Sequence, residues 1–422
     1  MTGPSLSRRA LLRTGGAVGV AGLLGVGAVA AAGPSAVPYP DGVSYQDVAL
    51  VSPAHRNSAI EHLRELTTRA KPVVEEARAA GSLDGDRFFG VQGSIADAEA
   101  FLEESHPPSF DTISEARYHV RYVALALGGA AAALDDVSIG PDGPAQTGPA
   151  SGLEDLRTAL DYESDAAAEA MVWIDLIERR LHVAMIAGGN ARVDRSELDE
   201  NPERVRERAL SQAVVDHERS VRHLDDARQF YRTFQARQSM PVRVDLAAAR
   251  ETYRSRVAET AHDEEWYDAR RRAETTPRDT AWNRLLTLAP GEDSLDDAQW
   301  ARRDGLAGLE TTTLATALAA FRGFPTGKAA VERLDGRSSV PRSLLLDVKR
   351  RAVDGAYQIA ATGTDFEQWL LRSAAYYLSK GDGYLTETTI LDNWPRAHAL
   401  AAYGIAAGVI DAIPSVAAVV TE

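Results

Sequence analysis

Apolar residues recur at alternating steps of three and four in this chain, and this spacing limits its fold more than any other feature. Such a stripe lies along one face of an α-helix. No segment alternates apolar and polar residues over the length of a strand, so a sheet has no candidate strands. We therefore predict an all-α fold of antiparallel helical bundles with long helices and no sheet. The clearest stripe consists of Ile113, Ala116, Val120, Val123, Leu127, Ala130 and Leu134.

Helix boundaries are marked by capping residues, prolines and glycines. Ser52 followed by Pro53 is typical of a helix start, and Gly81 is typical of a stop. The chain near its end, residues 405–420, is apolar but contains a charge and a proline, so we predict a buried helix there rather than a membrane span. Long helices are expected over about 152–187, 202–238 and 241–274, and shorter ones over about 278–288, 294–322, 341–361, 365–379 and 384–412.

The first 32 residues are ordered as basic, then apolar, then small. Ser7-Arg8-Arg9-Ala10-Leu11-Leu12-Arg13 precedes an uncharged run that ends in alanines. This order resembles the twin-arginine (Tat) export signal, whose pattern is Ser-Arg-Arg-x-Phe-Leu-Lys. The resemblance implies recognition of Arg8 and Arg9 by the Tat translocase. It also implies a location outside the cytoplasmic membrane or on its outer face, with the signal either cleaved or kept as an anchor.

A Pro-rich segment follows the expected signal, and a second loop rich in proline and glycine occupies residues 138–151. Both segments are poor helix formers, so we place boundaries there. The expected organisation is a signal over 1–32, a tether over 33–44, an N-terminal helical region over 45–137, a linker or crossover loop over 138–151, a long-helix bundle over 152–274 and a C-terminal helical region over 275–422.

The composition is acidic and poor in lysine. The chain holds 61 Asp and Glu against 46 Lys and Arg, a net charge of −15, and only four of the basic residues are Lys. This balance opposes nucleic-acid binding. It resembles proteins of salt-loving archaea, whose acidic surfaces stay soluble because concentrated salt screens their repulsion. The chain has no cysteine, which excludes disulfides, thiol nucleophiles, iron–sulfur clusters and cysteine-ligated zinc.

Carboxylates and imidazoles share several of the predicted helices. Helical bundles that hold iron or manganese use inward-facing Glu and Glu-x-x-His pairs, because hard oxygen ligands and imidazole suit these metals. A lone His on an apolar stripe is more often a core residue than a ligand, and this interpretation is the simpler one here. The candidate ligands are Glu178, His182, His217, Glu259 and His262.

Aromatic residues gather late in the chain, on and between the last two predicted helices. Spacing of seven, as between Trp369 and Tyr376, is typical of a helix core, but the cluster is also a candidate pocket for an apolar ligand. The candidate pocket residues are Trp369, Tyr376, Tyr377 and Trp394.

Motifs of common catalytic sites are missing from the sequence. It has no Gly-x-Ser-x-Gly, no Gly-x-x-x-x-Gly-Lys-Ser/Thr and no His-Glu-x-x-His. We expect a non-catalytic exported helical protein, without a cofactor, that serves binding or cell-surface scaffolding. The alternative is a metal-carboxylate, ferritin-like bundle that uses iron or manganese in redox or storage work.

Overall fold

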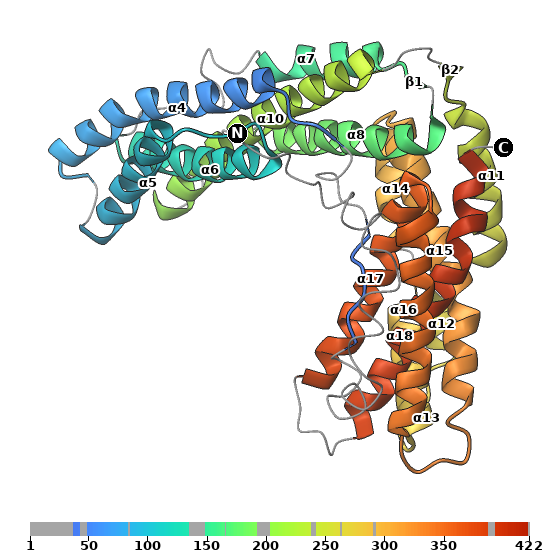
Figure 1. Ribbon diagram of the computed structural model, residues 1–422. Coiled ribbons are helices and arrows are strands. Elements are labelled where there is room, and N and C mark those ends of the chain that lie inside the picture. Colours follow the sequence, from blue (N-terminus) through green and yellow to red (C-terminus); the bar gives the residue numbers. More distant parts are fainter. Residues whose placement is uncertain are drawn as a thin grey trace, which may run out of the picture. The chain divides into compact units, whose positions relative to one another are not determined.

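The computed structural model of the protein describes residues 37–42, 49–82, 85–134, 148–164, 166–191, 203–237, 242–261, 264–289, 293–386 and 393–420. These residues are almost entirely helical (Figure 1). Two short strands, β1 (Glu163–Ser164) and β2 (Val242–Arg243), pair with each other. The predicted all-α fold is confirmed.

The chain forms two compact units. The described residues within 49–163 and 175–241 make up the N-terminal unit, and those within 1–48, 164–174 and 242–422 make up the C-terminal unit. The boundary lies inside helix α8 (Ala167–Asn190), between Ile174 and Asp175. Helices before and after the linker or crossover loop expected over 138–151 pack together within the N-terminal unit.

The N-terminal unit is built around α6 (Phe110–Ala133), which packs against α4 (Pro53–Ala79), α5 (Gly85–Glu103) and α10 (Glu203–Arg237). Helix α7 (Gly148–Ala159) also lies on α10. The predicted apolar stripe of α6 is buried from Ile113 to Ala130, and Leu134 packs against the same core. Burial of this stripe against three neighbours removes apolar surface from water and so stabilises the unit.

Helix α4 begins where the sequence predicts. Ser52 is the N-cap, and its hydroxyl accepts a hydrogen bond of 3.1 Å from the backbone N–H of His55. Pro53 occupies the first helical turn, and Gly81 adopts a φ of +68° just after the helix ends. This cap fixes the position of His55 at the start of α4.

The helix predicted over 152–187 is wrong as a single element. Helix α7 ends at Ala159, β1 follows, and α8 begins at Ala167. The Tyr231 hydroxyl accepts from the backbone N–H of Asp161 at 3.0 Å and donates toward the Ala159 carbonyl at 3.0 Å. A side chain from α10 thus satisfies backbone groups that a continuous helix would have paired internally.

The helix predicted over 241–274 is also wrong as a single element. It is replaced by β2, α11 (Leu246–Thr260) and α12 (Glu264–Asp268). Asp245 caps α11, because its carboxylate accepts from the backbone N–H groups of Ala247 and Ala248 at 3.1 and 3.0 Å. A local side-chain cap therefore sets the start of this helix.

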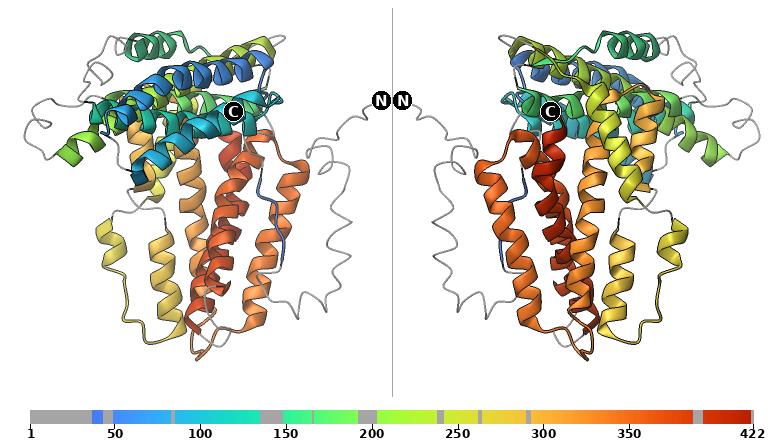
Figure 2. Two further views of the ribbon diagram at one scale, coloured as in Figure 1. Left: turned by 90° about the vertical axis from the view of Figure 1, so that its left-hand side faces the viewer. Right: turned by 90° about the vertical axis from the view of Figure 1, so that its right-hand side faces the viewer.

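The C-terminal unit is organised around α18 (Asn393–Ala417) (Figure 2). This helix contacts α13 (Pro277–Leu288), α15 (Ala307–Glu332), α16 (Arg342–Thr362) and α17 (Asp365–Thr386). Of the described helices, only the segment 394–420 is long and apolar enough to cross a membrane. In an apolar stretch of 18 residues within it, 72% is buried inside the protein. It is a core helix, as predicted. Helices α11, α12 and α14 (Asp293–Arg303) also belong to this unit, and residues Ala418–Val420 form a 3₁₀ turn.

Helices α15 and α18 approach closely along facing glycines. A Cβ added at Gly408 would lie 2.6 Å from the carbonyl oxygen of Gly323, and one at Gly404 would lie 2.9 Å from the Cα of Gly327. Both pairs are four residues apart on their helices, so they lie on one face of each. The absence of side chains at these positions lets the two backbones touch.

Part of the expected tether packs on the C-terminal unit. The ring centroid of Tyr39 lies 5.3 Å from the ammonium group of Lys349, which donates to Asp382 at 2.7 Å. Gly42 has a φ of +79°, and a Cβ there would lie 2.6 Å from the carbonyl oxygen of Gln368. Residues 37–42 therefore belong to the folded unit.

Candidate functional site

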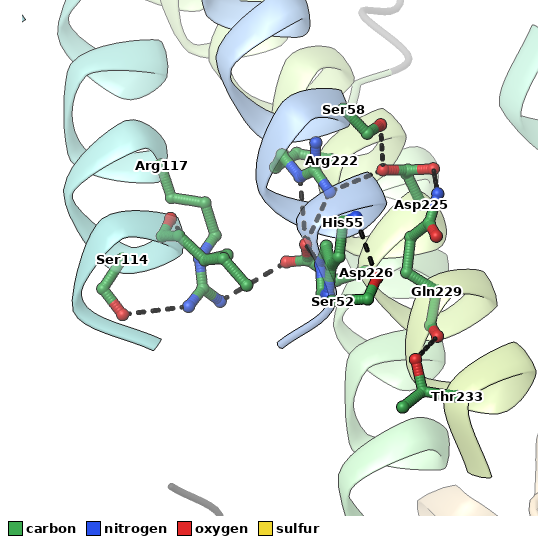
Figure 3. Close-up of polar contacts among 11 residues, drawn as sticks. Ser52, His55, Ser58, Ser114, Arg117, Arg222, Asp225, Asp226, Gln229 and Thr233 are labelled. Carbon is green, nitrogen blue, oxygen red and sulfur yellow. Dashed lines mark hydrogen bonds and ion pairs between the residues drawn. The ribbon is translucent and has the colours of Figure 1, made fainter. Parts of the chain in front are cut away.

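A buried network of charged groups joins α4, α6 and α10 in the N-terminal unit (Figure 3). Asp226 is fully buried at its centre. Its carboxylate accepts from Arg222 at 2.6 and 3.1 Å and contacts the His55 imidazole at 2.7 Å. Arg117 approaches the other carboxylate oxygen at 3.6 Å. Three segments far apart in the sequence thus meet on one side chain.

The network extends to Asp225, which is 26% exposed. Its carboxylate accepts from Arg222 and from the Ser58 hydroxyl, each at 2.6 Å. Burial opposes the charge on Asp226, but Arg222 and His55 hold the pKa of its carboxyl well below the usual range. Asp226 is therefore ionised in the folded protein, and its charge depends on these partners.

Beside this network lies a cavity of about 480 Å³, whose walls come from α6 and α10. A volume of this size is within the range of small-molecule sites. Its polar wall is cationic, and Asp216 is the one carboxylate that lines it among the described residues. The arginines of the wall are Arg117, Arg121, Arg219 and Arg222.

Arg222 is the most buried of these arginines, with 1% of its surface exposed. Its Nε and Nη2 groups bond Asp226 and Asp225, whereas its Nη1 group has no hydrogen-bond partner within the described ranges. A buried N–H group without a partner is costly, so such groups commonly bind a ligand or ordered water. Arg222 is thus anchored on one side, and on the other it keeps a buried N–H group that lacks a partner within the described ranges.

The electrostatics of nearby groups reflect this positive environment. Burial lowers the pKa of His223 to about 3, and Arg180, Arg117 and Arg219 contribute in the same direction against Asp226. Burial likewise lowers the pKa of Arg117 to about 10. Burial is the larger cause of both shifts, and the neighbouring guanidinium groups add to it.

The low pKa of His223 predicts an acid-sensitive unit. His223 is neutral when folded but takes up a proton in the unfolded chain below its ordinary pKa of about 6.5. Its contribution to stability is therefore complete above about pH 6.5 and is lost as the pH falls toward 3. Urea unfolding followed by circular dichroism should show this loss between about pH 6.5 and 5.

The control for this prediction is His223→Gln, which removes the titrating group. The variant should lose less stability than the wild type over the same pH interval. Glu218 also favours acid unfolding, because His62 and Arg69 outweigh its burial and hold its pKa at about 2, but its effect begins only below its ordinary pKa. Equal losses for the variant and the wild type above pH 5 would contradict the assignment to His223.

Four of the five predicted metal ligands lie among the described residues, on three helices. Glu178 and His182 lie on α8 and His217 on α10, all in the N-terminal unit, whereas Glu259 is exposed on α11 of the C-terminal unit. His262 lies outside the described residues. In the part of the chain that the structure describes, no three His, Asp or Glu side chains are grouped to hold a metal ion.

The predicted aromatic pocket is divided between core and surface. Trp369 and Tyr377 are buried on α17, where Trp369 stacks on Phe366 with centroids 5.8 Å apart. Tyr376 and Trp394 are 54% and 44% exposed.

The candidate export residues Arg8 and Arg9 lie outside the described residues.

Sequence reasoning missed the arginine cavity, because we searched for pairs of acid and imidazole. A usable signal was present on α10. Arg222 and Asp226 are four residues apart, and Leu224 and Phe230 are buried on the same helix. An ion pair amid the buried residues of a helix indicates a buried network rather than a solvated surface.

Two family comparisons cover most of the chain. Residues 54–240 match the family described as Domain of unknown function (DUF8262). Residues 243–422 match the family described as Domain of unknown function (DUF8264). The matched ranges meet near residue 241, where the N-terminal unit ends. No curated protein and no solved structure matches the chain.

Proposed function

We propose that this chain is an exported, non-catalytic binding protein whose N-terminal unit holds a small anionic ligand in the arginine-lined cavity. The observation that carries the proposal is Arg222, which lines the cavity, is almost fully buried and has an unpartnered Nη1 group among the described residues. Guanidinium groups bind carboxylate, phosphate and sulfate through short charge-assisted hydrogen bonds.

The balance of charge around the cavity supports an anion. Four arginines line the wall, against Asp216 in the wall and Asp225 and Asp226 in the network behind it. Arginine cannot ligate a cation, so this site favours the binding alternative over the metal-carboxylate alternative. The acidic surface does not prevent binding in brine, because contacts at hydrogen-bond distance persist when salt screens longer-range repulsion to about 3 Å at 1 M.

Export by the Tat pathway remains part of the proposal and rests on the sequence around Arg8 and Arg9. A folded, cysteine-free bundle is compatible with a pathway that carries folded proteins. Fusion of residues 1–40 to a reporter tests it directly. The reporter should leave the cytoplasm, and Arg8→Lys with Arg9→Lys should retain it; export of the double variant would contradict the proposal.

Titration calorimetry tests the binding site with sulfate and acetate at constant ionic strength. Arg222→Met should weaken binding by roughly tenfold to a hundredfold, because it removes hydrogen bonds to a charged group worth about 1.5–3 kcal/mol. Arg219→Met is the second variant, since Arg219 lines the cavity, is exposed and lies outside the hydrogen bonds of the buried network. It should weaken binding by roughly twofold to tenfold.

The matched control is Arg64→Met. Arg64 lies on α4 of the same unit, pairs with the exposed Glu61 and does not line the cavity. It should bind sulfate and acetate as the wild type does. Equal binding by the wild type, Arg219→Met and Arg222→Met, or no binding by any of them, would overturn the proposal.

A further inference from the structure

The cavity wall carries an aromatic side chain next to its arginines. Tyr118 lines the cavity and is 58% exposed. Its ring is held by neighbours, because the Tyr122 ring lies 4.7 Å away and the His119 ring meets it edge-on at 5.5 Å. An exposed aromatic ring held in place at a cavity is a stacking surface for a ring-shaped ligand.

The cavity also contains a carboxylate that a bare anion would not favour. Asp216 is 5% exposed and accepts a hydrogen bond of 3.1 Å from the Gln212 amide. A carboxylate repels a bound anion, so Asp216 is useful to the site only if the ligand also brings hydrogen-bond donors. A carboxylate has about four acceptor positions and an amide has two donors, so both side chains can bond ligand hydroxyls.

Building on the proposed anion site, we propose that the cavity takes an anionic monosaccharide: a hydroxylated sugar ring that carries a carboxylate, as in a hexuronate. The acid group meets the arginines, the ring lies on Tyr118, and the hydroxyls bond Asp216 and Gln212. A cavity of about 480 Å³ has room for such a ring. This assignment gives the arginines, Tyr118, Asp216 and Gln212 each a part of the ligand to bind.

Calorimetry with four probes separates the parts of the proposal. The probes are glucuronate, acetate, glucose and adenosine monophosphate, added to the full chain. Glucuronate should bind at least about tenfold more tightly than acetate, because the ring adds stacking and hydroxyl contacts. It should also exceed glucose, which lacks the acid group that the arginines bind.

Two substitutions at Tyr118 test the stacking contact. Tyr118→Leu should weaken glucuronate binding by roughly threefold to tenfold and leave acetate binding unchanged, because only the ring of the sugar uses this surface. Tyr118→Phe keeps the aromatic face and should retain most of the affinity. Tyr118 is outside the buried charge network, so neither change disturbs Asp226.

Asp216→Asn should change the affinity for acetate and the preference between the two probes differently. Removal of a negative charge from the cavity should strengthen acetate binding, whereas loss of a carboxylate acceptor should reduce the preference for glucuronate over acetate. A role of Asp216 in folding alone would change both affinities together. The two probes therefore distinguish recognition from structure.

The outcomes separate this inference from the proposed function. If acetate binds in an Arg219-dependent manner and glucuronate binds no better, the sugar assignment is overturned and the anion site stands. If adenosine monophosphate binds more tightly than glucuronate and depends on Tyr118, the ligand is a nucleotide and the sugar assignment is again overturned. If no anion binds, both proposals fail.

Discussion

Replacing Asp226 with asparagine should destabilise the N-terminal unit by about 3–5 kcal/mol, the range for removing one partner of a buried ion pair. The asparagine side chain would be a poor partner for Arg222, because a neutral amide leaves the buried guanidinium without the compensating charge that now lies 2.6 Å away. His55 and Arg117 would lose the same partner. The whole network depends on this one carboxylate.

Hydrogen exchange of α10 peptides measures this effect, because exchange of buried amides reports the free energy of opening. Tryptophan fluorescence serves as the readout for the other unit, since all six tryptophans lie in segments of the C-terminal unit. Asp226→Asn should reduce the protection of α10 amides against exchange. Its unfolding transition followed by circular dichroism should shift to a lower urea concentration.

Asp225→Asn is the matched control for Asp226→Asn. Asp225 is the neighbouring residue, bonds the same Arg222 at the same distance and is 26% exposed, whereas Asp226 is fully buried. Its loss should cost no more than about 1 kcal/mol, as for partly exposed pairs. If the two variants are equally stable, burial is not what makes Asp226 important.

The second large effect is expected at the contact between α15 and α18. Gly408→Ala should destabilise the C-terminal unit by about 1–3 kcal/mol, because the new methyl group would overlap the backbone of Gly323. A Cβ at Gly408 would lie 2.6 Å from the carbonyl oxygen and 2.7 Å from the Cα of Gly323. The backbone of a packed helix cannot yield as a flexible side chain does, so the helices must separate.

Gly383→Ala is the control with the opposite expected sign. Gly383 lies within α17, and a Cβ there would have no heavy atom within 4 Å among the described residues outside its own helix backbone. Alanine should then stabilise the helix by about 0.5–1 kcal/mol. Urea unfolding followed by tryptophan fluorescence measures both variants. A Gly408→Ala protein as stable as Gly383→Ala would show that the close approach has no energetic consequence.

Local sequence signals predicted the elements that local physics controls. The apolar stripe of α6 predicted its buried face, because helical spacing alone places those residues together. Ser52 and Pro53 predicted the start of α4 because a cap acts within three residues. The apolar segment containing Asp411 and Pro414 predicted a core helix, and α18 is one.

Structural features that depend on residues far apart in the sequence could not be predicted in this way. The break between α7 and α8 rests on Tyr231, whose hydroxyl bonds the backbone at Asp161 from 70 positions further along the chain. The unit boundary inside α8 has no proline or glycine to mark it. At the break between α7 and α8, tertiary contact overrides helix propensity, since propensity is worth less than about 1 kcal/mol per ordinary residue.

The sequence by itself determined that this protein is helical, acidic and free of cysteine, because periodicity and composition need no knowledge of which segments meet. Only the tertiary structure decided where its chemistry lies. His55, Arg117 and Asp226 come from three helices, and their charges interact strongly only because folding brings the first two within 4 Å of the third in a buried site. The arginine cavity beside them exists for the same reason, since its walls come from two helices that are far apart in the chain.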